Sequence, residues 1–362
     1  MKTQRASKAL NALPAGIHTA LDYRMHAEAR LDPQFWRYLD AGSGNNLSLA
    51  ANLQSFTQIR LMPRMLADLR RAHTRLELFG QQLDHPLLLA PVAYQRIFHP
   101  DAEPGSVAAA DAQGSIAIVS SLASTTLEEI ADAGTRPQWF QLYWQGERER
   151  SLRLVKRAIA AGYSAVVFTV DAPVKQAAMQ LPPQIRAINL EAPLLMPPLA
   201  DGQSPVFDGW MAQAPTWEDL AWLRDQISVP LLLKGVLHGD DARQALALGC
   251  DGLIVSNHGG RVLDGAPTSI DALPAILKET SRRVPVLLDS GIRNGSDAFK
   301  AIALGASAVL IGRPYIWGLA AAGALGVAHV LRLLRDELEM TMALTSCTSL
   351  SAIGEHCIIK PV

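Results

Sequence analysis

An internal repeat limits the folds that this chain can adopt. The segments VPLLLKGVLHGDDARQALALGCDGLIVSN, beginning at Val229, and VPVLLDSGIRNGSDAFKAIALGASAVLIG, beginning at Val284, share one pattern. Each is typical of a short strand rich in Leu and β-branched residues, a polar glycine turn, an amphipathic helix and a second strand. Continuous apolar strands that alternate with helices predict a parallel sheet covered on both faces.

The same alternation extends upstream. Gly114 and Gly162 each follow a helical pattern and precede an apolar strand, which suits the left-handed position that closes a helix. The candidate strands are Leu87–Ala90, Ile116–Ser120, Gln138–Leu142, Ala165–Thr169, Leu231–Lys234, Gly252–Ser256, Val286–Asp289 and Val309–Gly312. Eight such strands over about 250 residues predict an α/β protein, specifically a (β/α)₈ TIM barrel.

A doubly wound sheet is the alternative fold. It requires a dinucleotide-binding glycine turn after the first strand, whereas Gly42-Ser43-Gly44 lies in an N-terminal segment that we expect to be helical. We predict that residues 1–80 form a helical cap on one end and residues 81–362 the barrel, within one structural domain. The proline-rich stretch 172–228 is predicted to be a long loop after the fourth strand that covers the site.

Composition excludes several classes of protein. The net charge is −1, with no basic or acidic block, so we expect no nucleic-acid partner and no polybasic membrane anchor. The cysteines Cys250, Cys347 and Cys357 lack metal-ligand spacing and favour a reducing compartment. The most apolar stretch, 318–332, is shorter than the roughly 20 residues of a membrane helix. We therefore expect a cytoplasmic protein without a metal site or membrane span.

Polar residues gather where the predicted strands end. They are Gln141, Tyr143, Thr169, Asp171, Lys234, Ser256, Asn257, His258, Arg261, Asp289, Arg293, Gly312 and Arg313. Strand ends of a TIM barrel meet at one face, and buried charges cost several kcal/mol unless they are paired or used. The convergence predicts a functional site, although singly Asp171 and Asp289 could cap helices, His258 could cap the glycine turn and Lys234 could lie on the surface.

A phosphate site is predicted after the last two strands. The glycines of DSGIRNG (289–295) and IGRP (311–314) follow these strands, where backbone N–H groups of barrels commonly cradle phosphate. Arg293 and Arg313 would add bidentate contacts. We prefer this interpretation to one in which the glycines only form turns.

Several segments resemble one enzyme family. SNHGGRVLDGAPTSIDALP (256–274) closely resembles the signature of the FMN-dependent 2-hydroxy-acid oxidase/dehydrogenase family, which includes glycolate oxidase, lactate oxidase and mandelate dehydrogenase. The resemblance extends through segments 38–56, 87–95, 139–144, 168–173, 231–236, 289–297, 311–314 and 336–350, in the family's order. The SNHGGR segment is highly specific, whereas LAP and IGRP alone would be weak.

The resemblance implies FMN as cofactor. Pro91, Val92 and Ala93 would lie along the flavin, and Ser120, Gln141 and Thr169 would bond its ring system. Lys234 would stabilise the reduced, anionic flavin at the N1/O2 edge, with Ser256 also in the cofactor-binding set. The phosphate would be held by Asp289, Ser290, Gly291, Arg293, Gly312 and Arg313.

The resemblance also implies roles toward the substrate. His258 would take its proton, oriented by Asp171, while Arg261 and Tyr38 would bind its carboxylate and Tyr143 its hydroxyl. Elementary chemistry agrees with these roles. Oxidising a carbon that bears a hydroxyl needs a base, an electron-pair acceptor and a cation that binds the acid group. Hydride transfer and proton-first transfer both remain open. The expected partners are a 2-hydroxy acid, an electron acceptor (oxygen, a quinone or a protein) and identical subunits in a homotetramer.

Several positions depart from the family pattern. Ala178 stands where a substrate-binding arginine is expected, with Lys175 or Arg186 as possible substitutes, and Leu122 stands where many relatives carry tryptophan. Leu39 replaces a second tyrosine, Ser290 replaces a glycine, and Asn45-Asn46 replace an acidic pair. We favour a wider, more apolar substrate pocket over recruitment to a different substrate. Two further alternatives are a non-redox barrel enzyme that uses Lys234 as a Schiff-base amine and a flavin-binding protein without turnover.

Overall fold

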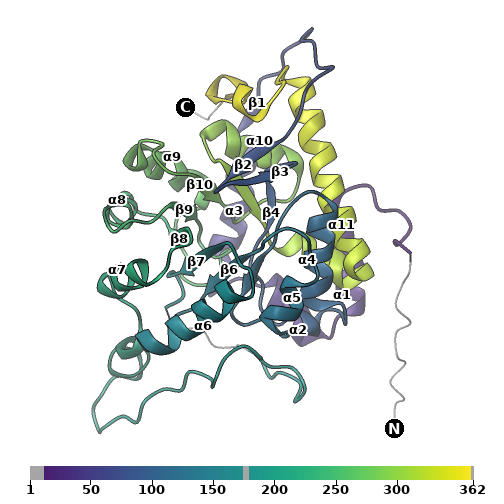
Figure 1. Cartoon of the computed structure of the whole chain (residues 1–362). Helices are drawn as coiled ribbons and strands as arrows, with labels where there is room; N and C mark the ends of the chain where they lie inside the picture. The colour runs from purple at the N-terminus through teal and green to yellow at the C-terminus, as the bar shows by residue number, and fades with distance from the viewer. Residues whose placement is uncertain (1–11, 174–178, 360–362) are drawn as a thin grey trace, which may run out of the picture.

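A closed barrel of parallel strands forms the centre of the protein (Figure 1). The computed structural model describes residues 12–173 and 179–359. The barrel strands are β4 (Leu87–Leu89), β5 (Ile118–Ser120), β6 (Trp139–Leu142), β7 (Ala165–Thr169), β8 (Leu231–Val236), β9 (Gly252–Val255), β10 (Val286–Leu288) and β11 (Ala308–Ile311). β11 pairs with β4, and a parallel bridge between Leu89 and Ala117 closes the ring. The predicted TIM barrel is confirmed, with strand ends within two residues of those expected.

A helix follows each barrel strand and packs on the outside. These helices are α4 (Ala102–Ala112), α5 (Leu127–Ala131), α6 (Arg148–Ala160), α7 (Trp217–Gln226), α8 (Gly239–Ala247), α9 (Ser269–Thr280), α10 (Gly295–Leu304) and α11 (Arg313–Leu344). Gly114 and Gly162, which follow α4 and α6, have φ of +77° and +95°. Both glycines therefore adopt the left-handed conformation that their place in the sequence predicts.

A hairpin closes the amino-terminal end of the barrel. Its strands are β2 (Leu76–Leu78) and β3 (Gln81–Leu83). The indole of Trp139, at the start of β6, donates to the Gln81 side chain at 2.8 Å, and its ring lies 5.5 Å from that of Phe79. Leu78 and Leu83 join the apolar core inside the barrel. This end is thus filled by aromatic and aliphatic side chains.

The N-terminal segment caps the opposite end. Its helices are α1 (Tyr23–Arg30), α2 (Pro33–Asp40) and α3 (Leu47–Gln58), preceded by the short helix η1 (Ala20–Asp22). Asp264, in the loop after β9, accepts hydrogen bonds from the backbone N–H groups of Asn45 and Ser48 at 2.7 and 2.9 Å. An acidic side chain stabilises a helix N-terminus, so Asp264 fastens α3 to the barrel.

The expectation that residues 1–80 are helical is wrong beyond α3. Residues Arg60–Leu61 form β1, which pairs with β12 (Ile358–Ile359), and the β2–β3 hairpin follows. The partner of β1 lies at the other end of the chain, so no local periodicity reveals it. Gly42–Gly44 lie in the connection between α2 and α3 rather than in a helix.

The loop after the fourth barrel strand is shorter than predicted. Of residues 172–228, the stretch Trp217–Gln226 forms α7, whose Leu220 and Leu223 are buried. Thr216 and Asp219 form a capping box that starts this helix, a signal that the prediction of a loop overlooked. The remainder includes the short helices η3 (Pro205–Trp210) and η4 (Met211–Gln213) and runs below α6 in Figure 1.

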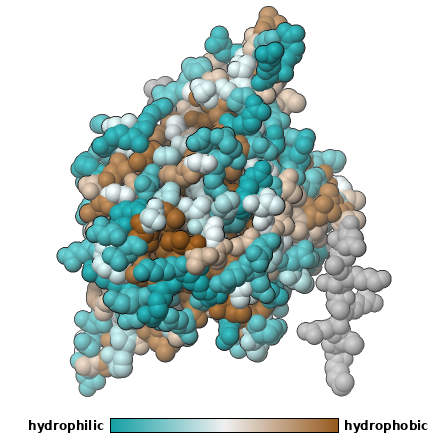
Figure 2. All heavy atoms as spheres, viewed as in Figure 1, coloured by the Kyte–Doolittle hydropathy of each residue, from teal (hydrophilic) through white to brown (hydrophobic). Residues whose placement is uncertain are grey.

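One helix, α11, is long and apolar enough to cross a membrane by length and composition. The sequence expectation missed it because glycines and His329 interrupt the apolar run. Within α11, 67% of the apolar window is buried inside the protein, where the helix packs on α4, α1 and α10. Its backbone also leaves the helical conformation at Ala322 and Gly323. This burial is that of an outer-ring helix. Figure 2 shows hydrophilic side chains mixed with hydrophobic ones over the visible face.

Candidate active site

The inward-facing side chains of the barrel change from apolar to polar toward the strand ends. The apolar core inside the barrel includes Trp139, Val167, Leu232, Ile254 and Leu287. Side chains two positions apart on a strand share a face. The next inward positions, all buried, are therefore Gln141, Thr169, Lys234, Ser256 and Asp289. This polar layer lies at the end of the barrel that carries function in such folds.

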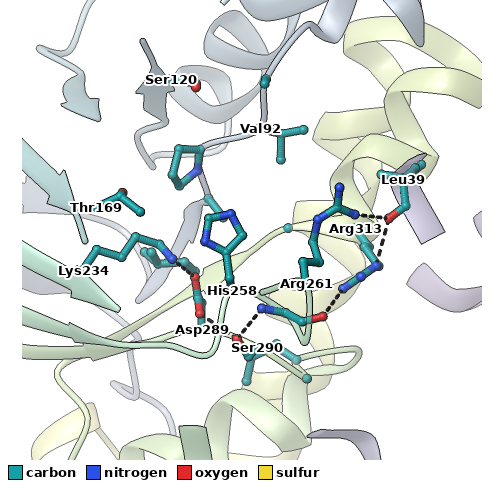
Figure 3. A pocket seen from close by; sticks show the side chains of 18 of the residues that line it. Leu39, Val92, Ser120, Thr169, Lys234, His258, Arg261, Asp289, Ser290 and Arg313 are labelled. Atoms are coloured by element: carbon teal, nitrogen blue, oxygen red, sulfur yellow. Dashed lines mark hydrogen bonds and ion pairs between the residues drawn. The ribbon is translucent and has the colours of Figure 1, made fainter. Parts of the chain in front are cut away.

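A cavity of about 930 Å³, including its opening, adjoins the polar layer (Figure 3). Of the residues predicted from the sequence, those that line it are Tyr38, Pro91, Val92, Ala93, Ser120, Tyr143, Thr169, Lys234, His258, Arg261, Asp289, Ser290, Gly291, Arg293, Gly312 and Arg313. The fold thus brings residues from every part of the chain to one cavity.

Three predicted residues lie behind the lining and contact it. Asp171 bonds His258, Gln141 accepts a hydrogen bond from Ser120 at 3.1 Å, and Ser256 accepts one from Lys234 at 2.8 Å. Asp171 and Ser256 act on the cavity through these neighbours, whereas Gln141 also has a side-chain nitrogen without a partner among the described residues. Ala178 and Lys175 lie outside the described residues, and Arg186 is exposed and does not line the cavity.

His258 is held on both ring nitrogens. Its Nδ1 lies 2.9 Å from Asp171 Oδ1, and its Nε2 lies 3.1 Å from the Tyr143 hydroxyl. The side chains of His258 and Asp171 are only 15% and 11% exposed. A carboxylate on one nitrogen fixes the ring orientation and directs the other nitrogen into the cavity, the arrangement expected of a general base. Asp171 bonds His258 and is not the cap of any described helix, so the helix-capping interpretation of Asp171 is excluded.

The backbone that carries His258 is unusual. His258, Gly259 and Gly260 all have positive φ, of +59°, +67° and +73°. Two of these positions suit glycine, whereas histidine accepts the left-handed conformation at an energetic cost. The Ser256 hydroxyl accepts a hydrogen bond from the His258 N–H at 3.0 Å and so helps to hold the turn. The SNHGG sequence therefore builds a tight turn that projects the imidazole into the cavity.

Lys234 forms an ion pair on the floor of the cavity. Its Nζ lies 2.7 Å from Asp289 Oδ2, and the two side chains are 4% and 10% exposed (Figure 3). The same Nζ donates to Ser256 Oγ. A cation held here in a dry environment is preorganised to stabilise negative charge that develops in the cavity. Asp289 pairs with Lys234 instead of capping a helix.

Arg261 lies between the cavity and the N-terminal cap. Its Nη1 donates to the carbonyl oxygens of Tyr38, Leu39 and Ala41, at 2.6, 3.2 and 3.3 Å. Its guanidinium carbon lies 4.9 Å from the centre of the Tyr38 ring. Within the described part of the chain, its Nε and Nη2 make no hydrogen bond, which leaves donors for an anion in the cavity.

Two tyrosines near His258 remain hydrogen-bond donors at neutral pH. Burial raises the pKa of Tyr143 well above its usual range, and the nearby Asp171 carboxylate raises it further. Burial also raises the pKa of Tyr38, while the positive charge of Arg261 works against that shift. Both hydroxyls therefore stay protonated and can donate to a bound oxygen atom.

One side of the cavity, next to Arg261, is strongly basic. Arg313 donates to the carbonyl oxygens of Leu39, Gly259 and Ala41, and Arg293 lies over the ring of Trp317. Burial lowers the pKa of Arg313, and the positive charges of Arg261 and Arg293 lower it further. Buried like charges need a counter-charge. A phosphate dianion would supply one, beside the backbone of residues 290–292.

Two buried polar atoms test whether a flavin fits this cavity. Gln141 Nε2 and Thr169 Oγ1 are shielded from solvent and have no hydrogen-bond partner among the described residues. Leaving such groups unpaired costs about 1–3 kcal/mol each, so a ligand with polar edges is expected beside them. A flavin pyrimidine ring offers such edges, the arginines Arg293 and Arg313 suit its phosphate, and Pro91, Val92 and Ala93 line the same cavity. The residues fit FMN.

Sequence reasoning missed some lining residues. Gly259 donates its N–H to Ser290 Oγ at 2.9 Å and accepts from Arg313, and Ile292, Ala90 and Leu310 also line the cavity. The glycine pair after His258 was the available signal for Gly259. The three apolar residues carry no signal that separates them from other core residues.

The fold and site define a flavin-dependent oxidoreductase of the TIM-barrel class. Residues 27–360 match the family model described as FMN-dependent dehydrogenase. This chain belongs to that family, and FMN is its cofactor.

Similar proteins cover nearly the whole chain. An L-lactate oxidase from Alicycliphilus denitrificans is 48% identical, over 96% of this chain and 98% of its own length. A 4-hydroxymandelate oxidase from Amycolatopsis orientalis is 43% identical, over 91% and 95%. A solved structure of mandelate oxidase with (S)-2-phenylpropionate matches with a TM-score of 0.85 and 39% identity, over 96% of this chain and 99% of its own.

Replacing Arg313 with methionine is expected to weaken FMN binding about 10- to 150-fold. Such a loss corresponds to roughly 1.5–3 kcal/mol for hydrogen bonds to a charged group. Fluorescence titration of apoprotein with FMN measures it. Inorganic phosphate alone should raise the melting temperature of wild-type apoprotein and not that of the variant, and an equal phosphate effect in both would place the phosphate elsewhere.

Proposed function

We propose that this protein oxidises a 2-hydroxy acid with an apolar side chain to the 2-oxo acid, with FMN as electron acceptor. The observation that carries the proposal is the arrangement of His258, which is bonded to Asp171 and Tyr143 in the same cavity as Lys234 and Arg261. A base, a carboxylate-binding cation and a cation on the flavin side are the parts this reaction needs. The names of the relatives, L-lactate oxidase and 4-hydroxymandelate oxidase, support the class of reaction.

The residues divide the work as follows. The free donors of Arg261 and the Tyr38 hydroxyl bind the substrate carboxylate, and Tyr143 donates to the substrate hydroxyl. His258 Nε2 takes a proton from the substrate, and Asp171 stabilises the resulting imidazolium. Lys234 offsets negative charge that develops across the cavity floor. Bound FMN supplies the chemistry of two-electron acceptance.

Part of the cavity lining is apolar and can contact the substrate side chain. Leu39, Leu122 and Val92 line the cavity, and Leu39 and Leu122 stand where family members commonly have larger aromatic residues. These replacements favour substrates with side chains larger than methyl. Leu122 is almost fully buried, and its N–H donates to the Ser120 hydroxyl. This hydrogen bond helps to fix the position of Leu122.

The electron acceptor that returns the enzyme to its oxidised state is proposed to be oxygen. The relatives named L-lactate oxidase, 4-hydroxymandelate oxidase and 2-hydroxyacid oxidase 1 support this choice over a quinone or a protein. We further propose a cytoplasmic homotetramer without a membrane span. The family resemblance supports the tetramer, and the near-neutral charge and few cysteines support the location.

Anaerobic mixing with a panel of 2-hydroxy acids tests the function. The flavin absorbance is expected to bleach, and kcat/KM to rise about fourfold for each added side-chain methylene until the wall is filled, since burying one methylene contributes about 0.8 kcal/mol. Leu122→Trp should remove this gain for the larger acids and spare the smallest. Admission of air should then restore the oxidised spectrum with release of hydrogen peroxide.

A protein whose flavin is bleached by dithionite but by no acid in the panel would refute the assignment. A Schiff-base role for Lys234 is disfavoured on geometric grounds, because its Nζ already donates to both Asp289 and Ser256. A nucleophilic amine would have to break both contacts. A role limited to flavin binding is disfavoured by the Asp171–His258–Tyr143 chain, which binding alone does not need.

A further inference from the structure

Ser290 has a backbone conformation that disfavours serine. Its φ is +75°, and the residue is buried beside the cavity. A non-glycine residue in this region is strained, whereas glycine adopts it freely. Serine therefore adds a hydroxyl here at a cost in backbone energy that glycine would not have. The contacts of that hydroxyl indicate its role.

The Ser290 hydroxyl joins two parts of the site. It donates to Asp289 Oδ1 at 2.8 Å and accepts the backbone N–H of Gly259 at 2.9 Å. A carboxylate can only accept and an N–H can only donate, so both directions are fixed. The hydroxyl therefore connects the loop after β10 with the turn that carries His258.

The remaining contacts close a ring. Asp289 pairs with Lys234 through its other oxygen (Figure 3). Lys234 also donates to Ser256 Oγ, and the same Oγ accepts the N–H of His258. His258 and Gly259 are chain neighbours, which completes the circuit. The ring contains the cation on the cavity floor and the backbone of the imidazole, and Ser290 belongs to it through its side-chain hydroxyl.

We infer that Ser290 is a positioning residue whose hydroxyl closes this ring and makes bound FMN easier to reduce. The hydrogen bond to Oδ1 draws negative charge away from the Asp289 oxygen that faces Lys234. More of the positive charge of Lys234 then acts on the cavity, where reduction of the flavin adds negative charge. The inference rests on FMN binding and not on the proposed substrate.

Two variants separate the hydroxyl from the backbone. Ser290→Gly and Ser290→Ala both remove the hydroxyl, but only glycine relieves the positive φ. Both are expected to lower the ratio of reduced to oxidised FMN about three- to tenfold at a fixed potential, or about 15–30 mV for a two-electron couple. Equilibration with a reference dye measures this midpoint potential without any hydroxy acid. Apoprotein of Ser290→Gly should melt at a higher temperature than that of Ser290→Ala.

Ser281 provides a matched control. It is an exposed serine with φ of +48° at the end of α9, away from the cavity. Ser281→Gly and Ser281→Ala should differ in melting temperature and leave the flavin potential unchanged. A wild-type potential in Ser290→Gly would overturn the inference, and so would a shift confined to Ser290→Ala, which would trace the effect to backbone strain. Failure of the hydroxy-acid panel would leave these potentials interpretable.

Discussion

Replacement of His258 with alanine is expected to slow flavin reduction by the best hydroxy acid about 10²- to 10⁴-fold, the usual contribution of a general base. The reason is geometric, since His258 Nε2 faces the cavity while Nδ1 is held by Asp171 at 2.9 Å. Anaerobic stopped-flow absorbance at saturating substrate measures the change. FMN content should stay close to one per chain, because the predicted phosphate contacts do not include the His258 side chain.

The comparison variant for this experiment is Asp171→Asn. It keeps the size of the side chain but removes the charge that would stabilise an imidazolium, so a smaller loss than in His258→Ala is expected. The chemical reductant dithionite should reduce all three proteins at similar rates. Unchanged reduction by the hydroxy acid in His258→Ala would remove the proposed base from the mechanism.

Replacement of Arg261 with methionine is expected to lower kcat/KM about 30- to 3000-fold. Truncating one partner of a buried charge pair costs roughly 2–5 kcal/mol, and Arg261 has donors that no described residue uses. Arg261→Lys should recover only part of the loss, because a lysine lacks the planar fork that matches a carboxylate. Steady-state kinetics with the best substrate of the panel measures both variants.

A substrate analogue provides the control for Arg261. The amide of the same hydroxy acid lacks the carboxylate charge, so its slow turnover should be nearly insensitive to Arg261→Met. The flavin potential and the melting temperature report whether loss of the carbonyl contacts to Tyr38, Leu39 and Ala41 has loosened the cap. Equal losses for acid and amide would indicate a structural role instead of carboxylate binding.

Much of the fold could be predicted from the sequence because its signals are local. The repeat beginning at Val229 and Val284 sets the strand–helix period, and the helix-closing glycines Gly114 and Gly162 adopt the expected conformation. The pairing of β1 with β12 could not be predicted, since two short strands at opposite ends of the chain carry no mutual signal. Helix α7 was missed because proline-rich sequence before it masked its Thr216 cap.

The candidate site likewise has features that could be predicted from the sequence and features that could not. Polar residues at strand ends could be assigned to one face, because parallel strands share their direction. Their partners depend on barrel register, and the sequence therefore did not reveal that Lys234 pairs with Asp289 or that Ser290 reaches Gly259. The residue expected to differ most from the family, Ala178, lies outside the described residues.

The hairpin of β2 and β3 has a consequence for the order of events during turnover. Trp139, Phe79 and Leu83 fill the amino-terminal end of the barrel. In the described part of the chain, we therefore expect small molecules to reach the flavin from the opposite, carboxyl-terminal end. The oxo acid then departs by the route along which the acceptor arrives. We therefore expect the acceptor to reach the flavin after the oxo acid has left, so that slow release of the product would delay reoxidation of the flavin.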